Sequence, residues 1–163
     1  MIRLNKEIRI ESFIAFFGGS FMPKTFKTMV ELQGYIESLC TKAIQDTAKE
    51  AKDELYRCVD EQYYKDPEFY PNVYQRTETF LSHVASRLLS SNSAEIYVDI
   101  EGMHYKNGFD AWQVVSWASE SKHGADYYQT GTEDFWTTFI EWCNANLIVL
   151  LKKNLRKYGL KIR

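Results

Sequence analysis

Apolar residues recur every three or four positions from residue 29 to residue 58, which is the spacing of one face of an α-helix. No proline interrupts this stretch, and the opposite face, which carries charges that include Asp46 and Glu50, is predicted to be a solvated stripe. The predicted buried positions are Met29, Leu32, Ile36, Leu39, Ala43, Thr47, Ala51, Leu55 and Cys58. The pattern predicts a helix of about 35 residues, on the order of 50 Å long. Because a small domain is narrower than that, part of this helix is expected to meet a neighbouring subunit.

Two strands are predicted next, over residues 83–89 and 94–101, with a turn at 90–93. In the second segment Ile96, Val98 and Ile100 alternate with polar residues, which is typical of a strand with one buried face. After it, Asp110 could cap a short helix, or residues 114–118 could form another strand. The periodicity leaves both open, and residues 119–131 are expected to form a polar loop.

The last predicted element is a helix that opens within Gly131–Asp134, where an N-cap is followed by two acids, Glu133 and Asp134, in the first turn at the positive end of the helix dipole. Its predicted core positions are Phe135, Phe139, Trp142, Leu147 and Leu150. Gly159 stands where a glycine commonly ends a helix. Beyond it, Leu160 and Ile162 alternate with polar residues and could add a short terminal strand.

This order of elements predicts an α+β fold, with a long N-terminal helix and a C-terminal helix packed on a small antiparallel sheet. Residues 1–23 mix alternation with a short apolar run and end at Gly18–Gly19 and Pro23. We therefore expect residues 1–23 to be an N-terminal arm or strand extension, and residues 24–163 to be a single α+β domain.

Composition narrows the class of protein. Hydrophobic residues make up 45% and charged residues 26%, which excludes a disordered chain. The longest apolar runs, 13–17 and 147–151, fall well short of the about 20 residues that cross a bilayer, so neither a membrane span nor a signal peptide is expected. Three dispersed cysteines are typical of reduced thiols in a cytoplasm. Aromatic residues reach 15%, more than a small core hides, which indicates contacts with partners.

Chemical motifs are scarce. Gly18–Gly19 lacks the spacing of a phosphate-binding loop, and the three histidines lie some twenty residues apart. A site could assemble in space from His104, Asp99 and Glu101, but alternation favours a solvated strand face for the two acids. We predict no catalytic, cofactor-binding or metal-binding residues, and we expect the chain not to be an enzyme.

Six cations without an intervening acid end the chain: Lys152, Lys153, Arg156, Lys157, Lys161 and Arg163. The first four complement the negative end of the last helix dipole. Because Lys161 and Arg163 lie past Gly159, they are predicted to contact an acidic partner or the DNA backbone.

Residues 63–74 contain two prolines and five aromatic side chains. Tyr70, Pro71, Tyr74 and Arg76 combine a stiff backbone with amphipathic side chains, which is the composition of interface cores. These four residues are the predicted assembly contacts.

The order of these features resembles the tail-completion or neck (head–tail connector) proteins of long-tailed double-stranded DNA phages, most closely the branch in phages and prophages of Gram-positive bacteria. The resemblance covers about residues 25–163 and rests on the aromatic turn, the Tyr74–Thr77 string, and the Asp134–Trp136 start of the last helix. The D-T-G-x-L and P-F-x-x-P-A strings of the better-known branch are absent; Val73–Thr77 and Asp134–Thr138 stand in their places.

The resemblance implies a virion structural protein, made in the bacterial host cytoplasm, that forms a homo-oligomeric ring at the head–tail junction. Expected partners are other neck, portal or tail-tube proteins, with possible non-specific contact to packaged DNA and none to a membrane. It implies no cofactor and no catalytic residue. Two alternatives remain: a bacterial enzyme whose site is assembled from dispersed histidines and acids, and a double-stranded DNA-binding protein that uses the basic C-terminus.

Overall fold

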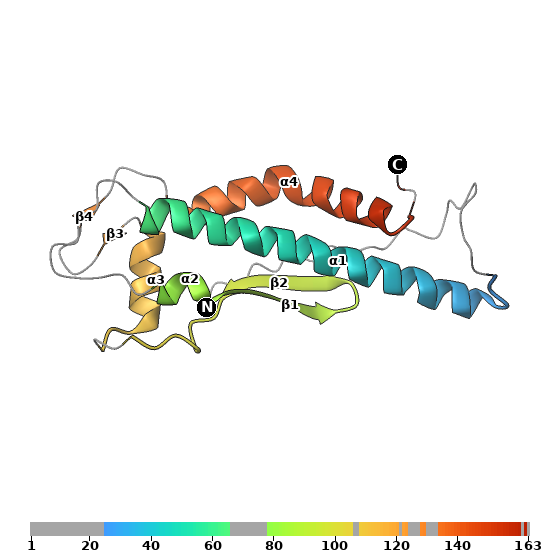
Figure 1. The fold of residues 1–163 in the computed structure, drawn as a ribbon, viewed down its shortest axis with the longest axis horizontal. Coiled ribbons are helices and arrows are strands. Elements are labelled where there is room, and N and C mark those ends of the chain that lie inside the picture. Colours follow the sequence, from blue (N-terminus) through green and yellow to red (C-terminus); the bar gives the residue numbers. More distant parts are fainter. Residues whose placement is uncertain are drawn as a thin grey trace.

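In the computed structural model, one long helix lies in the middle of the molecule. The structure describes residues 25–65, 78–105, 108–120, 122–123, 128–129, 134–160 and 162. Helix α1 (Met29–Val59) is flanked on one side by α4 (Phe135–Lys157) and on the other by the hairpin of β1 (Val84–Ser90) and β2 (Ser93–Val98) (Figure 1). The remaining elements are the π-helical turn η1 (Asp60–Tyr64), α2 (Thr79–Ser82), α3 (Ala111–Ser119), β3 (Lys122–His123) and β4 (Tyr128–Gln129). This arrangement confirms the predicted α+β fold. The predicted arm, residues 1–23, lies outside the described residues, so the division into arm and domain stays a prediction.

Helix α1 begins at a side-chain cap. The Thr28 hydroxyl accepts a hydrogen bond from the Glu31 amide at 3.2 Å, and the Glu31 carboxylate accepts one from the Lys27 amide at 2.8 Å. The 31 residues of α1 and the 5 of η1 agree with the predicted length. Most of the predicted buried face is confirmed, but Met29 is 73% exposed, because the first turns of α1 extend beyond both the hairpin and α4 (Figure 1).

The hairpin packs on α1, and its two strands pair antiparallel in a defined register. Val84 pairs with Val98 and Ser86 with Ile96, and the register shifts near the turn. Ile96 and Val98 pack against the core, as their alternation predicts. At the tip, the Thr41 hydroxyl of α1 donates a hydrogen bond of 2.8 Å to the Ser91 carbonyl, which ties the turn to the helix.

Helix α4 is capped at both ends. Asp134 was predicted to lie in the first turn, but it is the cap itself: its carboxylate accepts hydrogen bonds from the Thr137 amide and hydroxyl. At the other end the Gly159 amide bonds the Arg156 carbonyl and the Leu160 amide bonds the Leu155 carbonyl, with Gly159 at φ +84°. This is the Schellman arrangement, and Leu160 packs beside Leu155 in an apolar cluster. The possible terminal strand is therefore wrong: Leu160 belongs to the helix cap, and no strand is present at the described positions 160 and 162.

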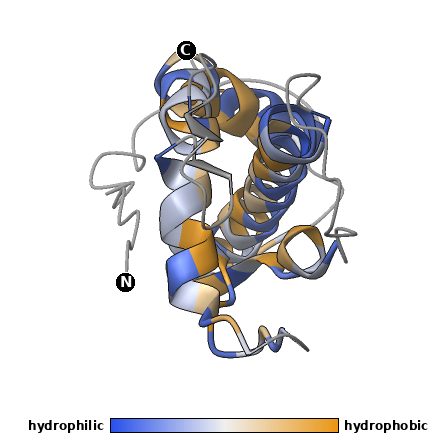
Figure 2. Cartoon of the chain, turned by 90° about the vertical axis from the view of Figure 1, so that its left-hand side faces the viewer, coloured by the Kyte–Doolittle hydropathy of each residue, from blue (hydrophilic) through white to orange (hydrophobic). Residues whose placement is uncertain are grey.

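The main core lies where α1, the hairpin, α3 and α4 converge. Phe135 and Phe139 are fully buried as predicted, and the rings of Phe80 and Phe135 lie 5.4 Å apart. Trp142 and Leu147 are half-buried and pack against the same cluster. An end-on view shows that α1 has a hydrophobic side toward the interior and a hydrophilic side outward (Figure 2).

The segment that periodicity left open is a helix. Asp110 caps α3 through a 2.7 Å hydrogen bond from the Trp112 amide to its carboxylate. The polar loop predicted after it contains the short antiparallel pair β3–β4. Within the described residues, no helix has the length and apolar character needed to cross a membrane.

Candidate functional site

The predicted interface residues lie outside the part of the chain that the structure describes. They are Tyr70, Pro71, Tyr74 and Arg76 in the aromatic turn and Lys161 and Arg163 at the C-terminus. Their role in assembly stays a prediction, and the candidate sites below come from described residues.

Two of the C-terminal cations pair with acids of α1. Lys153 Nζ donates a hydrogen bond of 2.7 Å to the Glu50 carboxylate, and Lys157 Nζ donates one of 2.7 Å to Asp46. The predicted purely solvated charge face of α1 is therefore wrong at these two acids. Because their charges are compensated, Lys153 and Lys157 contribute little to any field that would attract DNA.

A buried amide completes this contact. Asn154 is 1% exposed, and its Nδ2 donates to the Thr47 hydroxyl at 3.1 Å and to the Glu50 carboxylate at 3.0 Å. We call Asp46, Glu50, Lys153, Asn154 and Lys157 the polar clamp. It joins the middle of α1 to the C-terminal half of α4.

Hydrogen bonds in the polar clamp shift two carboxyl groups. The bond from Lys157, helped by one from the Tyr158 hydroxyl, holds the pKa of Asp46 below its ordinary value. Bonds from Lys153 and then Asn154 lower the pKa of Glu50 in the same way. Both shifts favour the charged carboxylates, which marks the clamp as a structural ion-pair network.

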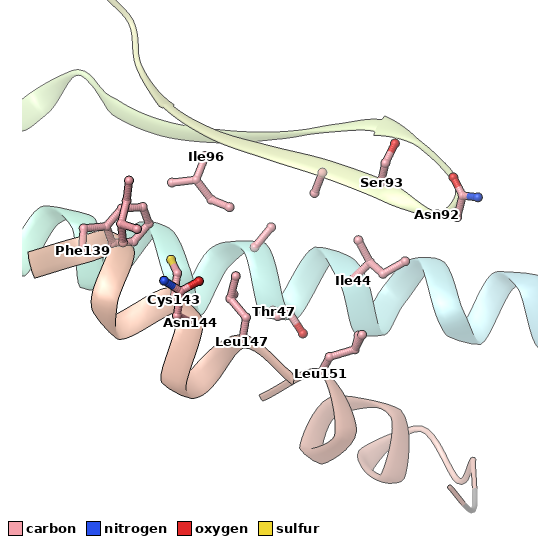
Figure 3. Close-up of a pocket in the computed structure, with 13 residues that line it drawn as sticks. Ile44, Thr47, Asn92, Ser93, Ile96, Phe139, Cys143, Asn144, Leu147 and Leu151 are labelled. Carbon is pink, nitrogen blue, oxygen red and sulfur yellow. The ribbon is translucent and has the colours of Figure 1, made fainter. Parts of the chain in front are cut away.

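A small apolar groove opens between β2 and α4, with α1 behind it (Figure 3). It has a volume of about 80 Å³. Its lining is mainly carbon and includes Ile44, Ala48, Ile96, Phe139, Leu147 and Leu151. A groove of this size and composition can accept an apolar side chain of a partner.

A second cavity, of about 420 Å³, lies between the end of the hairpin, α3 and the start of α4. Its walls include the aromatic rings of Tyr97, Trp112 and Trp136. The guanidinium of Arg87 binds the buried Glu95 carboxylate at 2.9 Å and lies 4.9 Å from the centre of the Tyr97 ring. Much of the polar lining is thus engaged in contacts within the hairpin.

Among the described side chains, the acids and histidines considered in the enzyme alternative do not line this cavity together. Asp99 and Glu101 line this cavity, whereas His83 and His104 do not. The two ring nitrogens of His83 lie 2.7 Å from the Thr79 carbonyl and 3.0 Å from the Gly102 carbonyl, which fixes the ring against the backbone. Among the described residues, no group of three histidine, cysteine or acidic side chains could hold a metal ion.

An exposed apolar surface on α4 was missed by sequence reasoning. Ile148 is 68% and Val149 is 64% exposed. The sequence of residues 147–151 contained the information needed to predict this surface. Five consecutive apolar residues lie on every side of a helix, so some of them must face outward.

Comparison with known families decides the class of protein. A family model described as YomN matches residues 28–157, from the cap of α1 to the last residue of α4. The chain belongs to the YomN family. This family derives from Bacillus phages and prophages, so the protein is phage-related. Comparison with curated proteins and with solved structures found no match.

Proposed function

We propose that this member of the YomN family is a virion structural protein at the head–tail junction, where it serves as a tail-completion or neck ring subunit. The observation that carries the proposal is the phage-derived family match over residues 28–157. The observed order of long helix, hairpin, short helix and final helix supports it, since the resemblance to neck proteins rests on that order.

The exposed apolar residues also support an assembled state. Met29 and Val30 are exposed on the turns of α1 that extend past the other elements, and Ile148 and Val149 are exposed on α4. Apolar surface of this kind is commonly covered by partners in an assembly. The groove between β2 and α4 offers a further place for an apolar side chain of a neighbouring protein.

In this proposal the protein acts by binding rather than by catalysis, and it needs no cofactor. Copies of the chain form a ring that contacts other neck, portal or tail-tube proteins. The protein is made in the host cytoplasm and is carried in the virion. Contact with packaged DNA would use Lys161 and Arg163, whereas Lys153 and Lys157 pair with acids in the polar clamp.

The test is a deletion of the gene in an inducible phage, with complementation in trans. We expect electron microscopy to show separate DNA-filled heads and tails in the deletion, and mass spectrometry to find the protein in purified complemented particles. The purified protein should form rings when mixed with its neck partners. Normal yields of joined, infectious particles without the protein would overturn the proposal.

A further inference from the structure

A line of exposed residues runs along the outer side of α4. At about 100° per residue, its members fall within an arc of about 100° on the side away from the core. All are exposed, and we call them the α4 stripe: Glu141, Ala145, Ile148, Val149, Lys152 and Arg156. The stripe thus has an acid at one end, apolar residues in the middle and cations at the other end.

The charges of the α4 stripe differ from those of the polar clamp. Lys153 and Lys157 reach back to acids of α1, whereas Glu141, Lys152 and Arg156 point away from α1. Within the described part of the chain, these three side chains have no ion-pair partner. They are available to a molecule that covers Ile148 and Val149.

The stripe is complementary to itself. When a second α4 runs antiparallel, with a two-fold axis between Ile148 and Val149, Ile148 of each copy lies opposite Val149 of the other. Glu141 precedes Ile148 by seven residues, and Arg156 follows Val149 by seven residues. Both steps cover about 10 Å along a helix, so each acid faces the other copy's Arg156. A parallel pair would instead place like charges together.

We propose that two copies of the chain pair through their α4 stripes, antiparallel about this two-fold axis. The exposed apolar centre becomes buried, and two symmetric Glu141–Arg156 pairs set the orientation. One helix pair lies at the low end of protein interface sizes, so the affinity is expected in the micromolar range.

This pairing goes beyond the neck assignment and does not rest on it. A two-fold contact closes on itself, so it joins chains in pairs, while a larger ring needs a second, heterologous contact elsewhere on the chain. The pairing therefore describes the free protein, and it is measurable without phage particles.

The test is analytical ultracentrifugation of the full chain at low salt, over about 1 to 300 µM, a range that brackets micromolar affinity. We expect the wild type to dimerise, and Glu141→Lys and Arg156→Glu each to weaken dimerisation by about tenfold or more. An equimolar mixture of the two variants should recover dimers. In a mixed pair the two substituted side chains face each other, and so do the unchanged Arg156 of one copy and the unchanged Glu141 of the other. Both contacts then again join opposite charges. Recovery only on mixing is specific to the antiparallel register.

Two further variants separate this surface from general charge or folding effects. Lys42→Glu reverses an exposed cation on α1 and should leave dimerisation unchanged. Ile148→Ser with Val149→Ser should give a monomer with the wild-type unfolding midpoint, since both side chains are exposed. A monomeric wild type, a mixture that recovers nothing, or an equal effect of Lys42→Glu would overturn the pairing. None of these results would affect the neck assignment, which the gene deletion tests.

Discussion

Lys157 of α4 donates a hydrogen bond of 2.7 Å to Asp46 of α1, across 111 positions of the sequence. Lys153, one turn earlier in α4, makes the equivalent bond to Glu50, one turn later in α1. Because the two helices run antiparallel, a step of four residues on each keeps the pairs aligned. The polar clamp therefore sets the register of α1 against α4.

The clamp should make stability depend on acid pH. Asp46 and Glu50 have pKa values held below their ordinary 3.8 and 4.5 by their hydrogen bonds. Their stabilising effect is complete at neutral pH and is lost as the pH falls through about 4.5 and below. Because Asp46 and Glu50 are 29% and 36% exposed at the side chain, each should contribute less than about 1 kcal/mol.

This expectation is checked by urea unfolding between pH 3 and pH 7. The Asp46→Asn, Glu50→Gln double variant should be less stable at pH 7 and should lose less stability on acidification than the wild type. Parallel pH profiles for the two proteins would contradict the assignment.

Asn154 should matter more than the charged members of the clamp. Replacing it with alanine removes the donor to Thr47 and Glu50 at a site with almost no access to water, which should cost about 1–3 kcal/mol in the free energy of unfolding. Lys152→Ala is the control on the same helix, because Lys152 is exposed; its effect should stay within about 0.5 kcal/mol. Chemical unfolding at neutral pH measures both, and equal effects would argue against the buried role of Asn154.

Two glycines should respond in opposite directions to alanine. Gly34 lies in the exposed part of α1, and an added Cβ there would meet nothing within 4 Å, so Gly34→Ala should stabilise the protein by up to about 1 kcal/mol. Gly159 has φ +84° in the cap of α4, where a side chain is strained, so Gly159→Ala should destabilise it by about 1 kcal/mol. Thermal unfolding of both variants would show whether the signs differ as expected.

The final two cations should act through charge alone. Lys161→Gln with Arg163→Gln is expected to leave the unfolding midpoint unchanged and to weaken attachment to a neck partner or to DNA, most strongly at low salt. Lys153→Gln is the contrasting variant, because it removes a partner of Glu50 and should lower stability instead. If the double variant binds like the wild type at every ionic strength, these charges have no role in assembly.

Local signals in the sequence determined where most elements begin and end. Thr28, Asp110 and Asp134 each bond an amide two or three residues away, and Gly159 permits a turn that few other residues adopt. The long apolar period of α1 and the alternation in β2 were likewise sufficient to predict a helix and a strand, because each pattern depends on near neighbours along one element. These features are visible without a tertiary structure.

Contacts between distant segments were decided only by the fold. Nothing in the sequence links Asp46 to Lys157, because the pairing depends on how α1 and α4 pack together. Ile148 and Val149 are as apolar as the predicted core positions Leu147 and Leu150 beside them, but α1 covers only one side of α4 and leaves them in water. Met29 continues the apolar period of α1, but no described element extends far enough to bury it, since the length of a helix is set locally while its burial depends on its neighbours.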